Sequence, residues 1–223
     1  MSPERKPFRR IGPDQRREAM IGAMLAVIAE DGIAAATTRA VAARAGVTPG
    51  LIRHYFDSKD ALLSAAYERH MTDLTRATCH AGQGASAAER LAAFIVAGLS
   101  APVVSAEAVS LWAGFLTHAQ RSAGMQEVHA RTYAEFRDHL QALVADALRE
   151  AGRGAHGAAP QDVLRRHAIA CNAVIDGLWL EGGMLPDAFA PGELASIGLD
   201  TIGAMLKLPL AARPEALTQG MTP

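Results

Sequence analysis

The sequence predicts an all-α fold of about nine helices. Apolar residues recur at the three- and four-residue spacing of amphipathic helices through most of the 223 residues, whereas no stretch shows a convincing strand alternation. Serine, threonine, proline and glycine interrupt this pattern where helices are expected to begin and end. Half of the residues are apolar, which is ample for a core, and the length exceeds what one small helical unit needs. We therefore expect two helical domains without an internal repeat.

The first predicted helix covers residues 14 to 32. Ile21, Met24 and Ile28 fall on one face of it, at the spacing of a helix that packs against a core. Asp14 is a candidate cap at its start, and Gly32 ends the segment.

Two short helices joined by a tight turn are predicted between residues 38 and 56. Thr38 is the expected cap of the first helix, and Gly46 stops it. Thr48 can cap the second helix, with proline at its first position, where the missing amide hydrogen would be unpaired anyway. Such a pair is typical of a helix-turn-helix unit. Small or polar side chains on its exposed side would let the second helix approach the floor of a DNA major groove, namely Thr48, Pro49, Gly50, Arg53 and His54.

The other predicted helices follow from similar start and stop signals. Asp57 opens one of them, and Ser86-Ala87-Ala88-Glu89 forms a capping box before another. Pro160 and Pro191 begin the last two. These helices are expected at residues 57 to 78, 86 to 99, 105 to 121, 125 to 150, 160 to 182 and 191 to 206.

Charge and cysteine content limit the class of protein. Residues 1 to 76 carry 12 Lys or Arg against 9 Asp or Glu, whereas residues 77 to 223 carry 10 against 14, so the small basic excess lies with the helix-turn-helix unit. Cys79 and Cys171 lie far apart and give no support for a disulfide framework or a zinc site. A reducing cytoplasm fits this usage, and no apolar run is long enough to cross a bilayer. We expect no membrane association, no metal and no cofactor.

Enzymatic motifs are weak. Residues 152 to 157 match the glycine-rich dinucleotide fingerprint, but that motif needs a preceding strand, and a long helix is predicted there instead. The eight histidines form no metalloprotease motif and accompany no serine hydrolase motif. The prediction is therefore that the protein is not an enzyme, with an enzyme or carrier that has a helical ligand pocket left as the alternative.

One region carries a specific pattern of residues. It reads AARAGV at 42 to 47, HYFDSK at 54 to 59 and Leu62-Leu63. The pattern resembles the DNA-binding domain of the TetR family of bacterial repressors. This resemblance implies a helix-turn-helix DNA-binding domain with a basic arm over residues 1 to 59, a helical ligand-binding and dimerisation domain over residues 60 to 209, and a flexible tail over residues 210 to 223.

The resemblance also assigns roles within the first domain. Arg39 and Arg53 match positions that reach base edges, and Tyr55 and Lys59 match positions that hold phosphates. A solvated surface charge is the alternative for each arginine, and a core aromatic is the alternative for Tyr55. The partner is double-stranded operator DNA, and the predicted DNA-binding residues are Thr38, Arg39, Thr48, Pro49, Gly50, Arg53, His54, Tyr55 and Lys59.

Two segments of the second domain carry a further resemblance. They read SLWAGF at 110 to 115 and AVIDGLWL at 173 to 180. Both resemble the C-terminal domain of the choline-responsive BetI-like subfamily, which controls the synthesis of glycine betaine. The resemblance implies choline or betaine aldehyde as effector, with a TetR-family regulator that responds to another small molecule as the alternative, and a homodimer formed through the last two helices.

A ligand of this kind restricts the residues that can hold it. A quaternary ammonium cannot donate hydrogen bonds, so proteins bind it with aromatic faces and a nearby carboxylate. Asp176 lies one turn before Trp179 on the same helix face. Core packing is the alternative for the aromatic residues, and a dimer contact is the alternative for the aspartate. The candidate ligand-binding residues are Trp112, Phe115, Tyr133, Phe136, Asp176 and Trp179.

Overall fold

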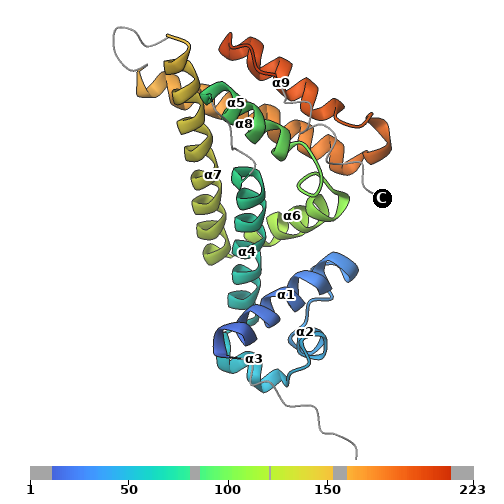
Figure 1. The fold of residues 1–223 in the computed structure, drawn as a ribbon. Helices are drawn as coiled ribbons and strands as arrows, with labels where there is room; N and C mark the ends of the chain where they lie inside the picture. The colour runs from blue at the N-terminus through green and yellow to red at the C-terminus, as the bar shows by residue number, and fades with distance from the viewer. Residues whose placement is uncertain (1–11, 81–85, 121, 153–159, 212–223) are drawn as a thin grey trace, which may run out of the picture. The chain divides into compact units, whose positions relative to one another are not determined.

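The computed structural model describes residues 12–80, 86–120, 122–152 and 160–211. This part of the chain forms nine α-helices and one short 3-10 helix, without a strand, which confirms the all-α prediction (Figure 1). The chain divides into two compact units, and the division falls after Tyr67, inside α4. The helices are α1 (Pro13–Asp31), α2 (Thr38–Ala45), α3 (Pro49–Tyr55), α4 (Lys59–His80), α5 (Ala87–Gly98), α6 (Ala106–Ala119), α7 (Ala123–Glu150), α8 (Gln161–Met184) and α9 (Glu193–Leu206), with the 3-10 helix at Pro186–Ala188.

Several helix starts differ from the prediction by one or two residues. Gly12 caps α1, because Pro13 occupies the first helical position, and Asp14 lies within the first turn, where it complements the helix dipole. Thr37 rather than Thr38 caps α2, accepting a hydrogen bond from the amide of Ala40 at 3.1 Å.

The start of α4 is the third case. Ser58 accepts a hydrogen bond from the amide of Ala61 at 3.0 Å, so the helix begins at Lys59 and Asp57 lies before it. The start of α9 also moves, since Gly192 stands at its cap and Glu193 is its first residue, two places after the predicted Pro191.

The first unit is built around a buried face of α1. Met20, Ile21, Met24, Val27 and Ile28 are all nearly inaccessible to solvent, at the spacing that the sequence predicts. An exposed pair of hydrogen bonds from the Arg44 guanidinium to the Glu30 carboxylate also joins α2 to α1. These contacts hold the short α2 in place, which alone is too short to be a stable helix.

The second unit has a core between α5, α7, α8 and α9. The capping box at the start of α5 is confirmed, because the Ser86 hydroxyl accepts from the Glu89 amide and the Glu89 carboxylate accepts from the Ser86 amide. Both faces of α5 are largely buried, as its continuous apolar run indicates. The largest fully buried side chains of this core are Phe94, Leu91, Ile95 and Leu140.

Some predicted features lie outside the described residues. They are the basic arm before residue 12, most of the glycine-rich segment at 152 to 157, and residues 212 to 223 of the predicted tail. Among the helices described, none combines the length and apolar content that a membrane crossing requires.

Gly198 tests the close packing of α9 on α5. A Cβ atom at this position would lie 2.4 Å from Cδ1 of Leu99 and 3.2 Å from Cγ2 of Ile95. We expect Gly198→Val to lower the free energy of unfolding by about 1–3 kcal/mol, because overpacking forces neighbours from their positions. Urea denaturation followed by circular dichroism measures this. The control is Gly22→Ala on α1, where a Cβ meets no atom within 4 Å and a gain of about 0.5–1 kcal/mol is expected; equal effects of the two substitutions would contradict the packing.

Candidate functional site

The turn between α2 and α3 is set by local interactions. Gly46 adopts a left-handed conformation with φ of 65°, and the amide of Val47 donates to the carbonyl of Ala42 at 2.9 Å, which closes α2. Thr48 then caps α3 by accepting from the amide of Leu51 at 3.3 Å, with Pro49 at the first helical position. These observations agree with the local geometry that the sequence predicts for a helix-turn-helix unit.

The two helices present a hollow between the start of α2 and the exposed side of α3. It is lined by Thr37, Thr38, Arg39, Pro49 and Arg53. The cap residue Thr37 is the member of this group that the sequence analysis missed, although its position next to a second threonine was a usable signal.

Both arginines of the hollow are exposed. Neither guanidinium has an ion pair or hydrogen bond with another described residue, in contrast to Arg44. Two unpaired guanidinium groups on neighbouring helix ends are suited to base edges and phosphates.

The other predicted DNA-contacting residues lie close by. Thr48, Gly50 and His54 are exposed, whereas Tyr55 and Lys59 are half-buried. The ring of His54 meets that of Tyr55 edge to face, with centroids 5.5 Å apart. Because Tyr55 is only half-buried, both of the roles considered for it remain compatible with its position.

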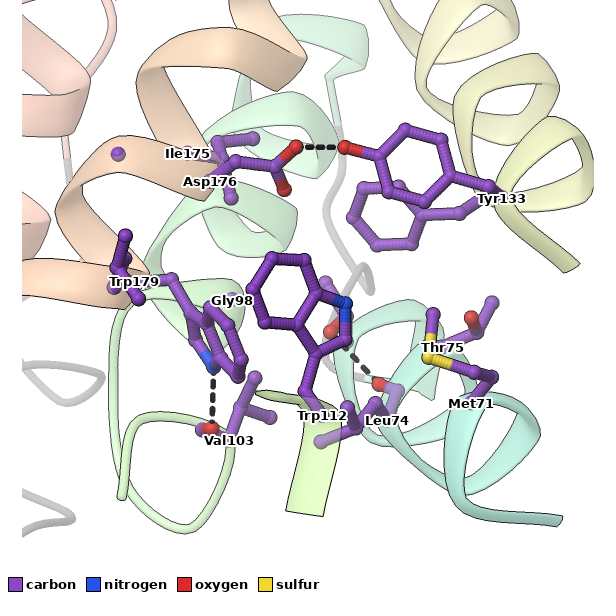
Figure 2. Close-up of a pocket in the computed structure, with 14 residues that line it drawn as sticks. Met71, Leu74, Thr75, Gly98, Val103, Trp112, Tyr133, Ile175, Asp176 and Trp179 are labelled. Carbon is purple, nitrogen blue, oxygen red and sulfur yellow. Dashed lines mark hydrogen bonds between the residues drawn. The ribbon is translucent and has the colours of Figure 1, made fainter. Parts of the chain in front are cut away.

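The second unit contains a cavity of about 310 Å³ that is walled by α4, α6, α7, α8 and the end of α5 (Figure 2). Five of the six predicted ligand-binding residues line it, namely Trp112, Tyr133, Phe136, Asp176 and Trp179. The sixth, Phe115, is fully buried and packs its ring near that of His70, so the structure places it in the core and outside the lining. The surrounding wall is mainly aliphatic, formed among others by Met71, Leu74, Val103, Ile175 and Leu180.

Two tryptophan rings form an aromatic corner. The indoles of Trp112 on α6 and Trp179 on α8 meet at 82° with centroids 5.7 Å apart. The Trp179 ring is fixed in orientation because its Nε1–H donates to the carbonyl of Val103 at 2.8 Å (Figure 2). An indole face that borders a cavity attracts a compact cation, because the face of an aromatic ring carries negative potential.

Asp176 is the acidic residue in this wall, and two donors hold its side chain. The Tyr133 hydroxyl on α7 donates to the carboxylate, and Nδ2 of Asn172 donates to Oδ2 at 2.8 Å and to the tyrosine oxygen at 2.9 Å. Figure 2 shows one carboxylate oxygen directed at Tyr133 and the other pointing away from it, toward the indole rings. The sequence analysis missed Asn172, which lies four residues before Asp176 on the same helix face.

Burial dominates the electrostatics of this group. It raises the pKa of Asp176 despite the two hydrogen bonds, which act in the opposite direction. Burial, followed by the bond to Asp176, raises the pKa of Tyr133 to about 12, so the phenol stays a donor at neutral pH. A positive charge placed beside such a carboxylate would stabilise its ionised form, which burial alone disfavours.

Comparison with known proteins identifies the family. Residues 21–66 match the family described as bacterial regulatory proteins, tetR family, and residues 87–207 match the family described as BetI-type transcriptional repressor, C-terminal. The chain belongs to the TetR family. Its second unit is of the BetI type, and TetR-family members are transcriptional regulators, so the enzyme alternative is excluded.

Individual relatives agree with this assignment. The HTH-type transcriptional regulator BetI of Paraburkholderia phytofirmans is 31% identical over 86% of this chain and 93% of its own. The crystal structure of a Pseudomonas aeruginosa transcriptional regulator aligns with a TM-score of 0.78 and 31% identity, covering 90% of this chain and 95% of that one. A transcriptional regulator of Saccharomonospora viridis, solved in complex with choline, aligns with a TM-score of 0.65 and 18% identity, over 90% of this chain and 100% of that one, which shows a shared fold alone.

The raised pKa of Asp176 leads to a prediction for this TetR-family protein. The pKa of Asp176 is higher in the folded protein than in the unfolded chain, so deprotonation of this group lowers the free energy of unfolding. The loss begins as pH rises through the unfolded-state pKa and is complete above the folded-state pKa. We therefore expect Asp176→Asn to raise the free energy of unfolding at pH 8, and the gain to disappear as pH falls below the ordinary aspartate range. Urea denaturation across pH 3 to 8 measures the difference. The control is Asp138→Asn, at an exposed position on α7. The prediction is wrong if the free energy of unfolding gained by Asp176→Asn over the parent protein is smaller at pH 8 than at pH 4.

Proposed function

We propose that this TetR-family regulator is a BetI-like repressor of choline and glycine betaine genes, with choline or betaine aldehyde as its effector. The observation that carries the proposal is the Asp176 carboxylate set beside two perpendicular indoles in a mainly apolar cavity. The match to the BetI-type family and the relatives named BetI support it. A fold shared with a choline-bound regulator is compatible with it.

The chemistry of the cavity suits a trimethylammonium group. Such a group has a diffuse positive charge, no hydrogen-bond donor and an apolar surface, so it is desolvated more readily than a primary ammonium. Contact with an aromatic face contributes about 0.5–2 kcal/mol per ring. The free carboxylate oxygen of Asp176 supplies the counter-charge, while Tyr133 and Asn172 keep the other oxygen occupied.

DNA recognition is proposed to use α3 as the helix that enters the major groove. Arg53 would read base edges together with Arg39, while Lys59 and Tyr55 would hold phosphates and fix the register. TetR regulators form dimers and bind operator DNA. In a two-fold dimer the two α3 helices would be spaced by about one DNA turn, roughly 34–36 Å.

Dimerisation of this chain is proposed to use α8 and α9. Large apolar side chains on these two helices and just after α8 remain exposed in the single chain. Exposed large apolar side chains gathered on two neighbouring helices are typical of an interface. The residues are Ile169, Leu180, Met184, Leu185, Ile197 and Met205.

The proposed route from effector to DNA runs through α4. Its last turns contribute Met71, Leu74, Thr75 and Thr78 to the cavity wall, and the same helix begins at Lys59, within the DNA-binding unit. A ligand that shifts α4 would change the spacing of the two reading helices. A coupling free energy of about 1–3 kcal/mol is sufficient for a 5- to 150-fold change in operator affinity.

Ligand-induced stabilisation tests the effector. We expect choline and betaine aldehyde to raise the melting temperature by about 5–10 °C when present at about one hundred times their dissociation constant. Glycine betaine should give a smaller shift, because its carboxylate meets that of Asp176. If neither cation changes the melting temperature or the tryptophan fluorescence at millimolar concentration, choline-type ligands are excluded.

Substitution of Arg53 tests the DNA-reading surface. Selection of bound sequences from a random duplex pool should yield a palindromic motif with the parent protein, and with Arg53→Ala a motif that has lost its preference at the one or two base positions in each half-site that Arg53 reads, since the guanidinium contributes about 1–3 kcal/mol of base discrimination. Lys59→Ala is the matched control, because loss of a phosphate contact weakens binding to all sequences similarly and reduces the salt dependence by about one ion. An unchanged motif with Arg53→Ala would contradict the assignment.

A further inference from the structure

The cavity is larger than choline requires. Its volume of about 310 Å³ equals the share of about ten water molecules in the liquid. Choline has about seven non-hydrogen atoms and would displace roughly four or five of these waters. About half of the space would remain after choline had bound, and a volume of this size falls within the range of about 300–1,000 Å³ that is usual for larger organic ligands.

The two ends of the cavity differ in chemistry. Figure 2 shows Asp176 and Tyr133 at one end and Met71 and Leu74 of α4 at the other, with Trp112 between them. At the α4 end the hydroxyl of Thr78 is already used, because it donates to the carbonyl of Leu74 at 2.9 Å. Thr75 adds a second hydroxyl at this end, but neither threonine carries a charge, so the counter-charge for a cation lies only at the Asp176 end among the lining residues.

Water would be held weakly at the α4 end. A water molecule in a protein interior needs two to four polar partners, and the α4 side of this wall offers the aliphatic side chains of Met71 and Leu74 with the hydroxyl of Thr75 beside them. Replacing weakly held water with an apolar group increases affinity. The same wall would lose dispersion contacts if it faced empty space.

We propose that this pocket takes quaternary ammonium cations that carry an apolar chain, and that it binds them more tightly than choline. The trimethylammonium group lies between Asp176 and the two indoles, and the chain extends toward Met71 and Leu74. This inference rests on the proposed function, since it places the cationic group at the same carboxylate. It adds that the part of the ligand in contact with α4 is the chain.

A homologous series of ligands tests the proposal by calorimetric titration of the full-length protein. The probes are tetramethylammonium, choline, and butyl-, hexyl- and octyltrimethylammonium. Burial of each methylene is expected to tighten binding by about fourfold until the cavity is full. Hexyltrimethylammonium should therefore bind at least tenfold more tightly than choline. If choline binds as tightly as the hexyl compound, or more tightly, the proposal is wrong.

Two variants separate this proposal from the function on which it rests. Leu74→Ala should reduce the gain per methylene, whereas Leu164→Ala, a matched change of a core-packing leucine outside the cavity, should keep it. Asp176→Asn should weaken all members of the series by a similar factor. If the cations need Asp176 but chain length has no effect, only the present proposal fails; if Asp176→Asn leaves all affinities unchanged, the proposed function fails with it.

Discussion

A carboxylate in a mainly apolar cavity is the constraint on which the chemistry of the second unit depends. Burial raises the pKa of Asp176, so the ionised form is less stable there than in water. Tyr133 and Asn172, from α7 and α8, hold one of its oxygens and leave the other beside the indoles. A bound cation would compensate this charge without rearranging the wall. Under the proposed function, the site would be organised for a cation before the cation binds, which reduces the ordering that binding requires.

The first unit is stabilised mainly by short-range interactions. Helices α2 and α3 are too short to be stable alone. They are held by the caps at Thr37 and Thr48, by the left-handed conformation of Gly46 and by the buried face of α1. Because the caps satisfy the helix ends, Arg39 and Arg53 are left exposed and without partners among the described residues. The helix α4 belongs to both units, which makes it the element through which an effector could act on DNA binding.

The features predicted most accurately from the sequence are those that depend on interactions between residues close together in the chain. The order of the helices, the turn at Gly46 and the capping box at Ser86 depend on contacts within a few residues, and all are found in the structure. Trp112 and Phe115 show the limit of this reasoning. They lie three residues apart on α6 and were given the same role, but α4 and α8 determine that one lines the cavity while the other is in the core. The spacing of Asn172 to Asp176 in the sequence places both residues on one helix face. Its role in holding the carboxylate becomes clear only from the position of Tyr133 on another helix, whose hydroxyl oxygen also accepts a hydrogen bond from Asn172.

The central claim is that the cavity recognises positive charge rather than shape. Calorimetric titration with choline and with 3,3-dimethylbutan-1-ol, in which carbon replaces the quaternary nitrogen, tests this claim directly because the two ligands have nearly the same size and hydroxyl position. The account predicts that choline binds at least tenfold more tightly, since only the cation interacts favourably with the charge of Asp176 and with the aromatic rings of Trp112 and Trp179. Equal affinities, or tighter binding of the neutral alcohol, would contradict it.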